Sequence, residues 1–432
     1  MDKHPPLTTG AQAVEYIHSF SWLGSRPGLS RTRQLLAAMG NPEQKLQFIH
    51  IVGTNGKGST AAMLASVLTA ASYTTGLYTS PYIHHFEERM TVNGAEITGD
   101  ELAAITSWVG ELADQMEEHP TEFELVTCVA LEFFRRRGCD IVVLEAGMGG
   151  RLDSTNVIPA PQAVVITNIG LDHTAQLGNT VEAIAAEKAA VIKDGCPVVL
   201  YEQKESVTQV VREVCQAHGA SLTIARAQDV VLDRESPEGQ WWSWKGQSLF
   251  VPLLGDNQRH NGAVVLATLE AISAKYPVSA QALVQGLERV RWPGRFEVLS
   301  RNPWFVVDGG HNPQCAATVA DNLKRYFPGK APVLLMGVLE DKDRAGLCER
   351  VAPLAQAFVT ITPPSPRALD AETLARELSA YGAPAYAAAS ISQGVERAME
   401  LAGEDGLVCA LGSLYSVGEI RTCVLSKKGD LS

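Results

Sequence analysis

The stretch FIHIVGTNGKGST, residues 48–60, constrains the fold of this chain more than any other part of it. A run with strand character leads into a glycine-rich turn, and an apolar helical pattern follows the turn. Such a turn points backbone N–H groups at an anion and has the positive end of the next helix behind it, while Lys57 adds a point charge. The sequence therefore predicts a phosphate-binding loop between a buried strand and a helix.

This loop differs from the standard phosphate loop. Only Thr54 and Asn55 separate its first glycine from the Gly-Lys pair, which is a shorter spacer than usual, and Gly58 stands where a hydroxyl normally follows the lysine. That hydroxyl usually binds Mg²⁺, so a magnesium ligand has to come from elsewhere in the chain.

Composition bounds the class of protein. A chain of 432 residues is too long for one core of ordinary size, so we expect two domains, or three at most. Charged residues make up 19% and hydrophobic residues 46%, no apolar run reaches membrane length, and the N-terminus lacks a basic segment before an apolar one. We expect a folded cytoplasmic protein without a membrane partner. The eight cysteines form no CxxC spacing, which favours reduced core thiols.

The formal net charge of −12 argues against a nucleic-acid-binding surface, because such surfaces accumulate Lys and Arg. An anionic small substrate is compatible with this charge if the fold supplies a local basic pocket. Candidates that lie in or beside the motifs below are Arg89, Arg151, Arg259 and Arg295.

Apolar runs of strand length alternate with amphipathic segments of helix length, which predicts βα units and largely parallel sheets. The clearest runs are 48–52, 141–144, 163–167, 197–201, 305–307, 333–338, 358–361 and 407–411. Segment 229–255 differs, and we expect short antiparallel strands around its Ser-Pro-Glu-Gly turn. Its Trp241, Trp242 and Trp244 could stack on a base or a pterin, but a hairpin packed over a sheet edge is the favoured interpretation. A domain boundary is expected near 292–296, where WPGRF breaks a helical segment.

Polar clusters follow the ends of the predicted strands. They are 53–59, 79–81, 145–153, 168–173 and 308–313. Ligands of open parallel sheets bind outside the carboxyl ends of the strands, so these clusters are expected to share one cleft.

Glu145 ends an otherwise apolar strand and precedes glycines, which suits a magnesium ligand. A helix cap or a strand-end salt bridge is the alternative. Ser80, before a proline, could supply the hydroxyl that Gly58 lacks, although Ser-Pro is also a common turn.

His173 follows Asp172 in a loop, where a lone histidine is more often solvated than bound to a metal. Lys188 falls on the apolar stripe of a helix predicted over 181–193. A buried lysine has to be paired, neutralised or modified unless its head group reaches water at the helix end. A carbamate formed with CO₂ would turn this amine into an anionic metal ligand beside Glu145 and His173.

These motifs resemble those of folylpolyglutamate synthases, including the bifunctional bacterial enzymes that are also dihydrofolate synthases. The matching motifs are GTNGKGS, YTSP, LEAGMGGRLDSTN, NIGLDH, EKA, WPGRFE, DGGHNP, LEDKD, TPPSPRA and GSLYSVGE, in this order. The family belongs to the Mur ligases, which phosphorylate a carboxylate with ATP and let an amine displace the phosphate. The resemblance implies an α/β fold with an N-terminal P-loop ATPase domain (1–295), which has a mainly parallel sheet and a small antiparallel sheet, and a C-terminal Rossmann-like domain (296–432).

The resemblance also implies a set of site residues. For ATP these are Gly53, Thr54, Asn55, Gly56, Lys57, Gly58, Ser59, Thr60, Asn261, Arg295 and Asp308. Two Mg²⁺ ions are implied, the first on Ser80 and Glu145 and the second on Glu145, His173 and carbamylated Lys188. The residues implied for catalysis are Lys57, Glu145, His173, Lys188 and Arg295.

For the other substrates, the resemblance implies a folate or dihydropteroate pocket and a glutamate site. The pocket would contain Leu29, Thr121, Phe123 and Asp153, and the glutamate site His311, Ser413 and Tyr415. A carboxylate such as Asp153 can accept two parallel hydrogen bonds from an aminopyrimidine edge, and an aromatic ring can cover its face. Ordinary helix core is the alternative for Phe123.

The expected reaction is phosphoryl transfer from ATP to a carboxylate, followed by attack of an amine on the acyl phosphate by a monomeric enzyme. Three alternatives stay open at this point: a P-loop kinase or NTPase, a non-catalytic nucleotide-binding protein, and a muramyl-peptide ligase. A ligase differs from the first two because it releases ADP and phosphate only together with a new amide.

Overall fold

The computed structural model describes residues 6–21, 24 and 26–427. The first five residues, part of the N-terminal stretch considered above, lie outside this range. The chain divides into two compact units. Unit 1 comprises 1–231, 242–250 and 259–290, and unit 2 comprises 232–241, 251–258 and 291–432. Each unit is described by itself.

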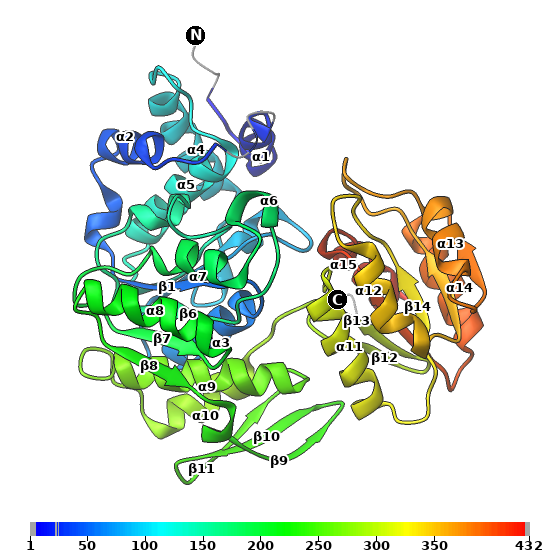
Figure 1. The fold of residues 1–432 in the computed structure, drawn as a ribbon. Helices are drawn as coiled ribbons and strands as arrows, with labels where there is room; N and C mark the ends of the chain where they lie inside the picture. The colour runs from blue at the N-terminus through cyan, green and yellow to red at the C-terminus, as the bar shows by residue number, and fades with distance from the viewer. Residues whose placement is uncertain (1–5, 22–23, 25, 428–432) are drawn as a thin grey trace. The chain divides into compact units, whose positions relative to one another are not determined.

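An eight-stranded sheet with the order β4-β3-β2-β5-β1-β6-β7-β8 forms the centre of unit 1 (Figure 1). Its strands are β1 (Phe48–Val52), β2 (Thr75–Tyr78), β3 (Met90–Val92), β4 (Ala95–Glu96), β5 (Ile141–Glu145), β6 (Ala163–Ile166), β7 (Val198–Tyr201) and β8 (Leu222–Ala225). The strands from β2 to β8 in this order are parallel, and β3 and β4 extend the sheet as an antiparallel edge. β1, β5 and β6 are buried throughout, as their apolar runs predict.

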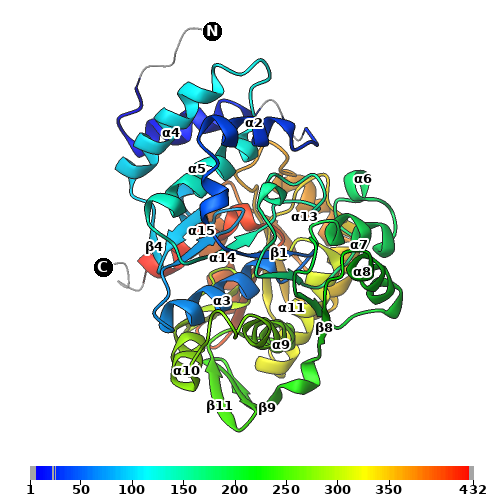
Figure 2. The ribbon, with the colours of Figure 1, turned by 90° about the vertical axis from the view of Figure 1, so that its left-hand side faces the viewer.

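Helices cover the sheet of unit 1. They are α1 (Gly10–His18), α2 (Ser30–Ala38), α3 (Lys57–Ala70), α4 (Gly99–Ala113), α5 (Glu122–Arg136), α6 (Thr174–Leu177), α7 (Val181–Ala189), α8 (Glu205–Ala217), α9 (Asp256–Ala271) and α10 (Ala280–Arg289). In both ribbon views α2, α4 and α5 form one group, whose buried side chains share a core with β1, β2 and β5 (Figures 1 and 2). α7 and α8 share a second core with β6 and β7. α3 packs on β1, β2 and β5, as its apolar face predicts, and also on α10.

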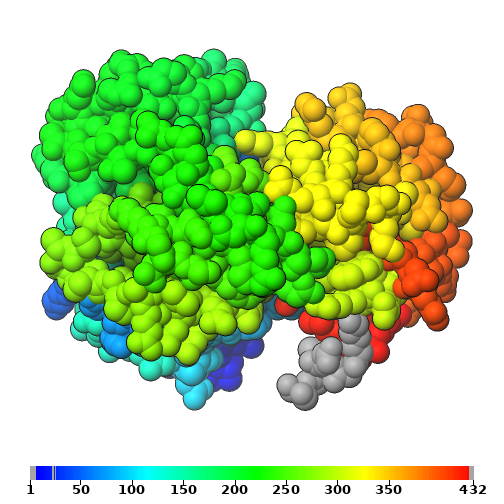
Figure 3. All heavy atoms as spheres, turned by 90° about the horizontal axis from the view of Figure 1, so that it is seen from below, coloured from blue at the N-terminus to red at the C-terminus, as the bar shows by residue number. Residues whose placement is uncertain are grey.

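The predicted antiparallel segment forms a small sheet with the order β11-β10-β9. Its strands are β9 (Val231–Ser236), β10 (Gly239–Trp244) and β11 (Gln247–Val251), and the first turn is the expected Ser-Pro-Glu-Gly turn. Trp242 is fully buried, and its ring packs directly on Gly262 of α9. This agrees with the hairpin interpretation for Trp242. Figure 3 shows the end of the molecule that carries α9, α10 and this hairpin, in green and yellow-green.

Unit 2 has a six-stranded mixed sheet with the order β12-β13-β17-β14-β15-β16. Its strands are β12 (Glu297–Arg301), β13 (Trp304–Val307), β14 (Val333–Met336), β15 (Ala357–Thr360), β16 (Ala385–Ala387) and β17 (Leu407–Leu411). Only β12 runs antiparallel to its neighbour. The helices are α11 (Pro313–Tyr326), α12 (Arg344–Val351), α13 (Ala371–Ser379), α14 (Ile391–Ala402) and α15 (Leu414–Ser426).

The predicted α/β fold class is therefore confirmed, with some differences in element bounds. The helix expected over 181–193 ends at Ala189. The N–H groups of Val191 and Ile192 donate to carbonyls three residues back, and a turn with Gly195 at φ 70° follows, so the chain leaves the helix. All eight cysteines are free thiols, and six of them are buried. No helix in the described part of the chain is long and apolar enough to cross a bilayer.

Candidate active site

The glycine-rich loop after β1 adopts the geometry that its sequence predicts. Gly53 and Gly56 have φ values of 154° and 88°, which favour glycine. A Cβ at Gly53 would lie 1.8 Å from the Thr167 hydroxyl oxygen, so no side chain fits there. Gly56 is the N-cap of α3, and no side chain caps this helix. The N-terminus of α3 therefore keeps N–H groups that can bind an anion.

The loops after β1 and β6 are joined. The N–H groups of Thr54 and Asn55 donate to the Asn168 carbonyl over 2.7 and 3.2 Å. The Thr54 hydroxyl exchanges hydrogen bonds of 3.1 Å with the backbone of Gly170. A Cβ at Gly56 would approach the Asn261 amide oxygen within 2.6 Å, so Asn261 of α9 lies directly against this turn. The expected ATP-binding residues of unit 1 are thus brought together.

Lys57 lies over the loop. Its ammonium donates to the carbonyls of Gly53 and Thr54 over 3.2 and 3.3 Å, and it lies 3.9 Å from a carboxylate oxygen of Glu145. Glu145 is the last residue of β5, pairs with Ile51 of β1, and is 4% exposed. The strand-end salt bridge weighed for Glu145 is thus present, and it places the carboxylate beside the loop lysine.

Lys188 is buried, as its place on an apolar stripe predicts. It lies near the end of α7, and its ammonium donates to the Gly53 carbonyl over 2.7 Å. Burial, assisted by the nearby charge of Lys57, lowers the pKa of Lys188 to about 7, although Asp153 and Asp172 oppose this shift. Lys188 is only 4% exposed, which argues against the snorkelling alternative.

Two further candidate metal ligands follow strand ends. Tyr78 of β2 pairs with Leu144 of β5 in parallel register, so Ser80 lies just beyond the level of Glu145. His173 is an exposed residue at φ 50° that precedes α6. The second metal site, on Glu145, His173 and carbamylated Lys188, stays a prediction.

The donor set is compatible with Mg²⁺, which prefers oxygen ligands and commonly takes one or two carboxylates together with substrate phosphates and water. Ser80 and Glu145 offer a hydroxyl and a carboxylate. Among the described residues, no group of three or more His, Cys, Asp or Glu side chains is arranged to hold a metal without such help.

The segment after β5 links these groups to the expected pterin residues. The ring of Phe123 lies on Gly147, where a Cβ would meet it at 2.5 Å. Gly150 packs against the backbone of Lys188, because a Cβ at Gly150 would lie 2.9 Å from the Lys188 carbonyl oxygen. Asp153 is buried at the end of this segment, and its pKa is raised by burial despite several hydrogen bonds. Glu145, Phe123, Lys188 and Asp153 therefore surround one short stretch of backbone.

Asp153 and Thr121 also have local structural partners. The Asp153 carboxylate accepts from Met148 N–H over 2.8 Å, from Thr155 N–H over 3.0 Å and from the Thr155 hydroxyl over 2.5 Å. Thr121 caps α5 together with Glu124. Leu29 is the partly buried N-cap of α2. These contacts explain the local fold without excluding a substrate from the remaining faces.

Unit 2 gathers its candidate residues at the ends of β13 and β17. Asp308 accepts hydrogen bonds from the N–H groups of Phe296 (2.8 Å) and Gly310 (2.6 Å). Burial raises the pKa of Asp308, and the nearby charge of Arg295 opposes this. A Cβ at Gly309 would lie 3.0 Å from the Arg295 guanidinium and 2.1 Å from Leu414, so the Asp308 loop contacts both the 294–296 turn and the start of α15.

The proposed glutamate residues lie in this same part of unit 2. A ring nitrogen of His311 is 3.1 Å from the Gly309 carbonyl oxygen, and Ser413 caps α15 by accepting from Tyr415 N–H. Tyr415 itself is exposed, and its hydroxyl lies 3.4 Å from Arg367.

Of the four arginines considered for a basic pocket, Arg295 is described above with the Asp308 loop, and the other three have different environments. Arg259 donates to the carbonyls of Ala227 and Val230, and Arg151 pairs with Glu187. The buried Arg89 guanidinium lies 5.6 Å from the centre of the Phe123 ring.

Sequence reasoning missed residues that hold the candidates in place. The ring of fully buried His50 is 2.9 Å from the Thr155 hydroxyl, and burial together with Lys193 lowers the pKa of His50 to about 3. His50 and Thr155 both stand inside motifs quoted above, yet nothing in the motifs signals that they meet. In unit 2, Glu297 ends the motif WPGRFE and pairs over 2.9 Å with Arg421, which lies outside the quoted motifs.

Both units match protein-family models. Residues 51–269 match the Mur ligase middle domain, and residues 294–414 match the Mur ligase glutamate ligase domain. The fold and the loop with Lys57, Glu145 and Lys188 thus define an ATP-dependent ligase of the Mur type.

Similar proteins narrow the class. The chain is 36% identical over 432 residues to the dihydrofolate synthase/folylpolyglutamate synthase of Bacillus subtilis, covering 96% of this chain and 99% of that one. Its fold matches the Mycobacterium tuberculosis folylpolyglutamate synthase complexed with ADP and AMPPCP, with a TM-score of 0.88, 30% identity and coverage of 96% and 98%. It also matches E. coli FolC in complex with DHPP and ADP, with a TM-score of 0.87, 28% identity and coverage of 98% and 100%. The chain belongs to the folylpolyglutamate synthase/dihydrofolate synthase family of Mur ligases. The kinase, non-catalytic and muramyl-peptide alternatives are accordingly not favoured.

Proposed function

We propose that this protein, acting as a monomer, adds L-glutamate to folates and also to dihydropteroate. One observation carries the proposal. The segment 145–153 begins with a carboxylate 3.9 Å from the phosphate-loop lysine, passes under Phe123 and along Lys188, and ends at Asp153. Groups suited to ATP therefore adjoin groups suited to an aromatic, hydrogen-bonding substrate within unit 1. The glutamate-ligase match of unit 2 supports His311, Ser413 and Tyr415 as residues for the incoming amino acid.

In the proposed reaction, a substrate carboxylate oxygen attacks the γ-phosphorus of ATP and ADP leaves. The amine of glutamate then attacks the acyl carbon, phosphate leaves, and the nitrogen loses a proton. Lys57 and Arg295 neutralise the charge that moves between the phosphates and the carboxylate, and the N-terminus of α3 orients the triphosphate. Mg²⁺ would supply additional charge neutralisation when bound. Ser80 and Glu145 are its proposed ligands.

One modification of this site is also proposed. Buried Lys188 would react with CO₂: its neutral amine forms the N–C bond and releases a proton, which converts a costly buried cation into an anionic ligand. With Glu145 and His173, this carbamate would hold a second Mg²⁺.

We also propose that residues 1–295 form the nucleotide-binding domain and residues 296–432 the glutamate-ligase domain.

The test is a product analysis. Purified protein is incubated with ATP, glutamate, and either tetrahydrofolate or dihydropteroate, and the products are weighed by mass spectrometry. We expect each acceptor to become heavier by glutamate residues, with one ADP per new amide. If only tetrahydrofolate gives a product, the proposed dihydrofolate synthase activity is overturned. ADP release without a new amide on either acceptor would overturn the proposed substrates.

A further inference from the structure

The turn that carries Arg295 has a backbone that needs support. Gly294 and Phe296, the residues on either side of Arg295, have φ values of 69° and 43°. Glycine adopts such values readily, but a bulky residue such as Phe296 does so only when the surrounding structure imposes it. The direction in which the Arg295 side chain leaves the backbone therefore depends on what holds this turn.

Carboxylates and backbone groups hold the turn from two directions. Asp308 accepts from Phe296 N–H over 2.8 Å, and Gly309 N–H donates to the Gly294 carbonyl over 2.9 Å. On the other side, Glu297 accepts from Gly294 N–H over 2.9 Å. Glu297 is the first residue of β12 and pairs with Val307 of β13, so it lies next to the turn and next to the Asp308 loop.

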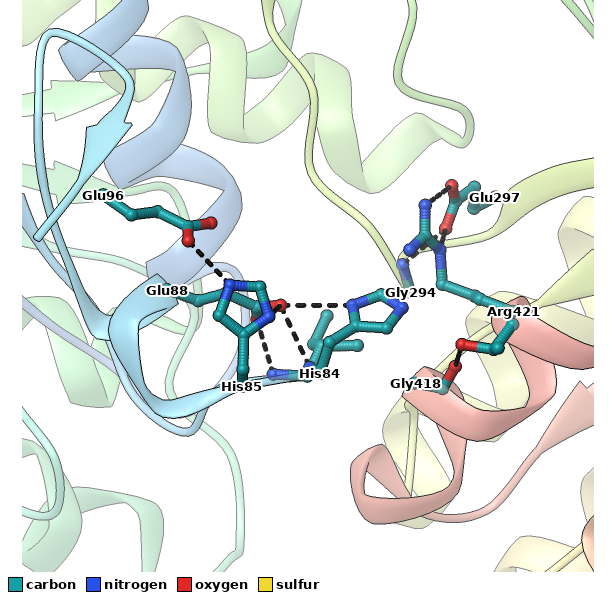
Figure 4. A network of polar contacts seen from close by, with 10 residues as sticks. His84, His85, Glu88, Glu96, Gly294, Glu297, Gly418 and Arg421 are labelled. Carbon is teal, nitrogen blue, oxygen red and sulfur yellow. Dashed lines mark hydrogen bonds and ion pairs between the residues drawn. The ribbon is translucent and has the colours of Figure 1, made fainter. Parts of the chain in front are cut away.

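Glu297 is itself fixed by Arg421 of α15. The guanidinium of Arg421 donates from Nε to Oε2 over 2.9 Å and from Nη2 to Oε1 over 3.0 Å (Figure 4). The side chains are only 17% and 25% exposed, and α15 packs on β12. A two-point contact of this kind sets the plane of the carboxylate and leaves the Oε2 atom aimed at Gly294 N–H.

We propose that Arg421 and Glu297 are positioning residues for Arg295. α15 holds Glu297 through Arg421, Glu297 holds Gly294 N–H, and the turn then presents the Arg295 guanidinium over Gly309. The inference rests on the role proposed for Arg295 at the ATP phosphates. It adds that this role depends on α15, which acts through Glu297 and the turn rather than by contact with the phosphates.

The first test compares Glu297→Gln and Arg421→Gln with the native enzyme in steady-state kinetics. Both variants are expected to lower kcat/KM for ATP by on the order of tenfold to a hundredfold, because a small displacement of the Arg295 guanidinium lowers the reaction rate strongly. KM for the folate should stay unchanged. Arg421→Lys keeps the charge but not the two-point contact, so an intermediate loss is expected.

The second test separates positioning from simple ion-pair stability. The double variant Glu297→Arg with Arg421→Glu restores an ion pair of opposite polarity, but the introduced guanidinium cannot accept from Gly294 N–H. The melting temperature should move back toward the native value while kcat/KM for ATP stays low. Recovery of both quantities would overturn the inference. Lys427→Gln, which removes the 3.0 Å ion pair between the end of α15 and Glu396, is the matched control and should leave ATP kinetics unchanged.

Arg295→Ala makes the two possible failures distinguishable. If it leaves kcat/KM for ATP at the native value, the role proposed for Arg295 is wrong and the inference falls with it. If Arg295→Ala is impaired while folded Glu297→Gln and Arg421→Gln keep native ATP kinetics, the inference alone is overturned.

Discussion

The loop after β1 in unit 1 and the loop after β13 in unit 2 both follow a buried parallel strand, but their polar groups are satisfied in opposite ways. In unit 1, Gly56 is the N-cap of α3, and no side chain caps this helix. In unit 2, Asn312 caps α11 by accepting from Cys315 N–H over 2.8 Å. The first helix start is open to a ligand, whereas the second is closed by the chain itself.

The charged side chains of the two loops differ in the same sense. Lys57 donates to backbone carbonyls and lies 3.9 Å from the Glu145 carboxylate, and buried Lys188 donates to the Gly53 carbonyl. Asp308 instead accepts two backbone N–H groups and lies near Arg295. The comparison teaches that the loop of unit 1 places Lys57 at an open helix start, where an anionic ligand can bind, while the loop of unit 2 is a scaffold that holds Arg295.

The largest expected effect is the loss of kcat/KM for ATP in the Lys57→Met variant. This substitution keeps an apolar stem of similar length and removes the charge above the loop. Loss of one preorganised charge of this kind is expected to lower kcat/KM for ATP by on the order of 10²- to 10³-fold, measured as ADP release in the presence of folate and glutamate.

The matched control is Lys245→Met, which removes an exposed lysine that pairs with Glu270 in the same unit. It should leave the kinetics unchanged. If Lys57→Met keeps native ATP kinetics, the open loop of unit 1 is not the phosphate site and the comparison breaks down.

Lys188→Met should lose activity and yet gain stability. The folded-state pKa of about 7 lies below the ordinary 10.5, so between these values the unfolded chain binds the proton more readily than the folded chain. The penalty therefore grows as the pH falls from about 10.5 to about 7 and is complete below that range. The difference of about 3.5 corresponds to on the order of 5 kcal/mol.

The measurement is denaturant unfolding of both proteins in CO₂-free buffer, followed by hydrogen exchange of the slowest amides in β1 and β6. The advantage of Lys188→Met in free energy of unfolding should be greatest near neutral pH and shrink as the pH rises. An advantage that does not change with pH would show that Lys188 is not a buried cation. If Lys188→Met keeps native activity, the proposed carbamate on Lys188 is wrong.

The sequence could predict the parts of the site that depend on local pattern. Period and glycine placement located the strands, the loop after β1 and the buried position of Lys188, because a strand-loop-helix unit is specified by neighbouring residues. The pattern could not show that the Lys188 ammonium reaches the Gly53 carbonyl, since that contact joins residues 135 positions apart.

Local polar geometry was equally beyond the sequence. Asp153 was expected to face an aminopyrimidine, and the motif LDSTN gave no sign that Thr155 and Met148 already bind its carboxylate. Glu297 stood in the motif WPGRFE, but a charged residue there is ordinarily exposed, so its contact with Gly294 could not be anticipated. Such hydrogen bonds depend on backbone turns that a residue pattern does not determine.

The smallest expected effect is that of Asn312→Ala, which opens the helix start that unit 2 keeps closed. Removing a side-chain cap costs about 0.5–2 kcal/mol, so hydrogen exchange in the first turn of α11 should accelerate while KM for ATP stays unchanged. Thr180→Ala, which removes the corresponding 3.1 Å cap of α7 in unit 1, is the matched control for cap loss alone. A rise in KM for ATP confined to Asn312→Ala would mean that the start of α11 also serves the nucleotide. The contrast between an open and a closed helix start would then no longer separate the two units.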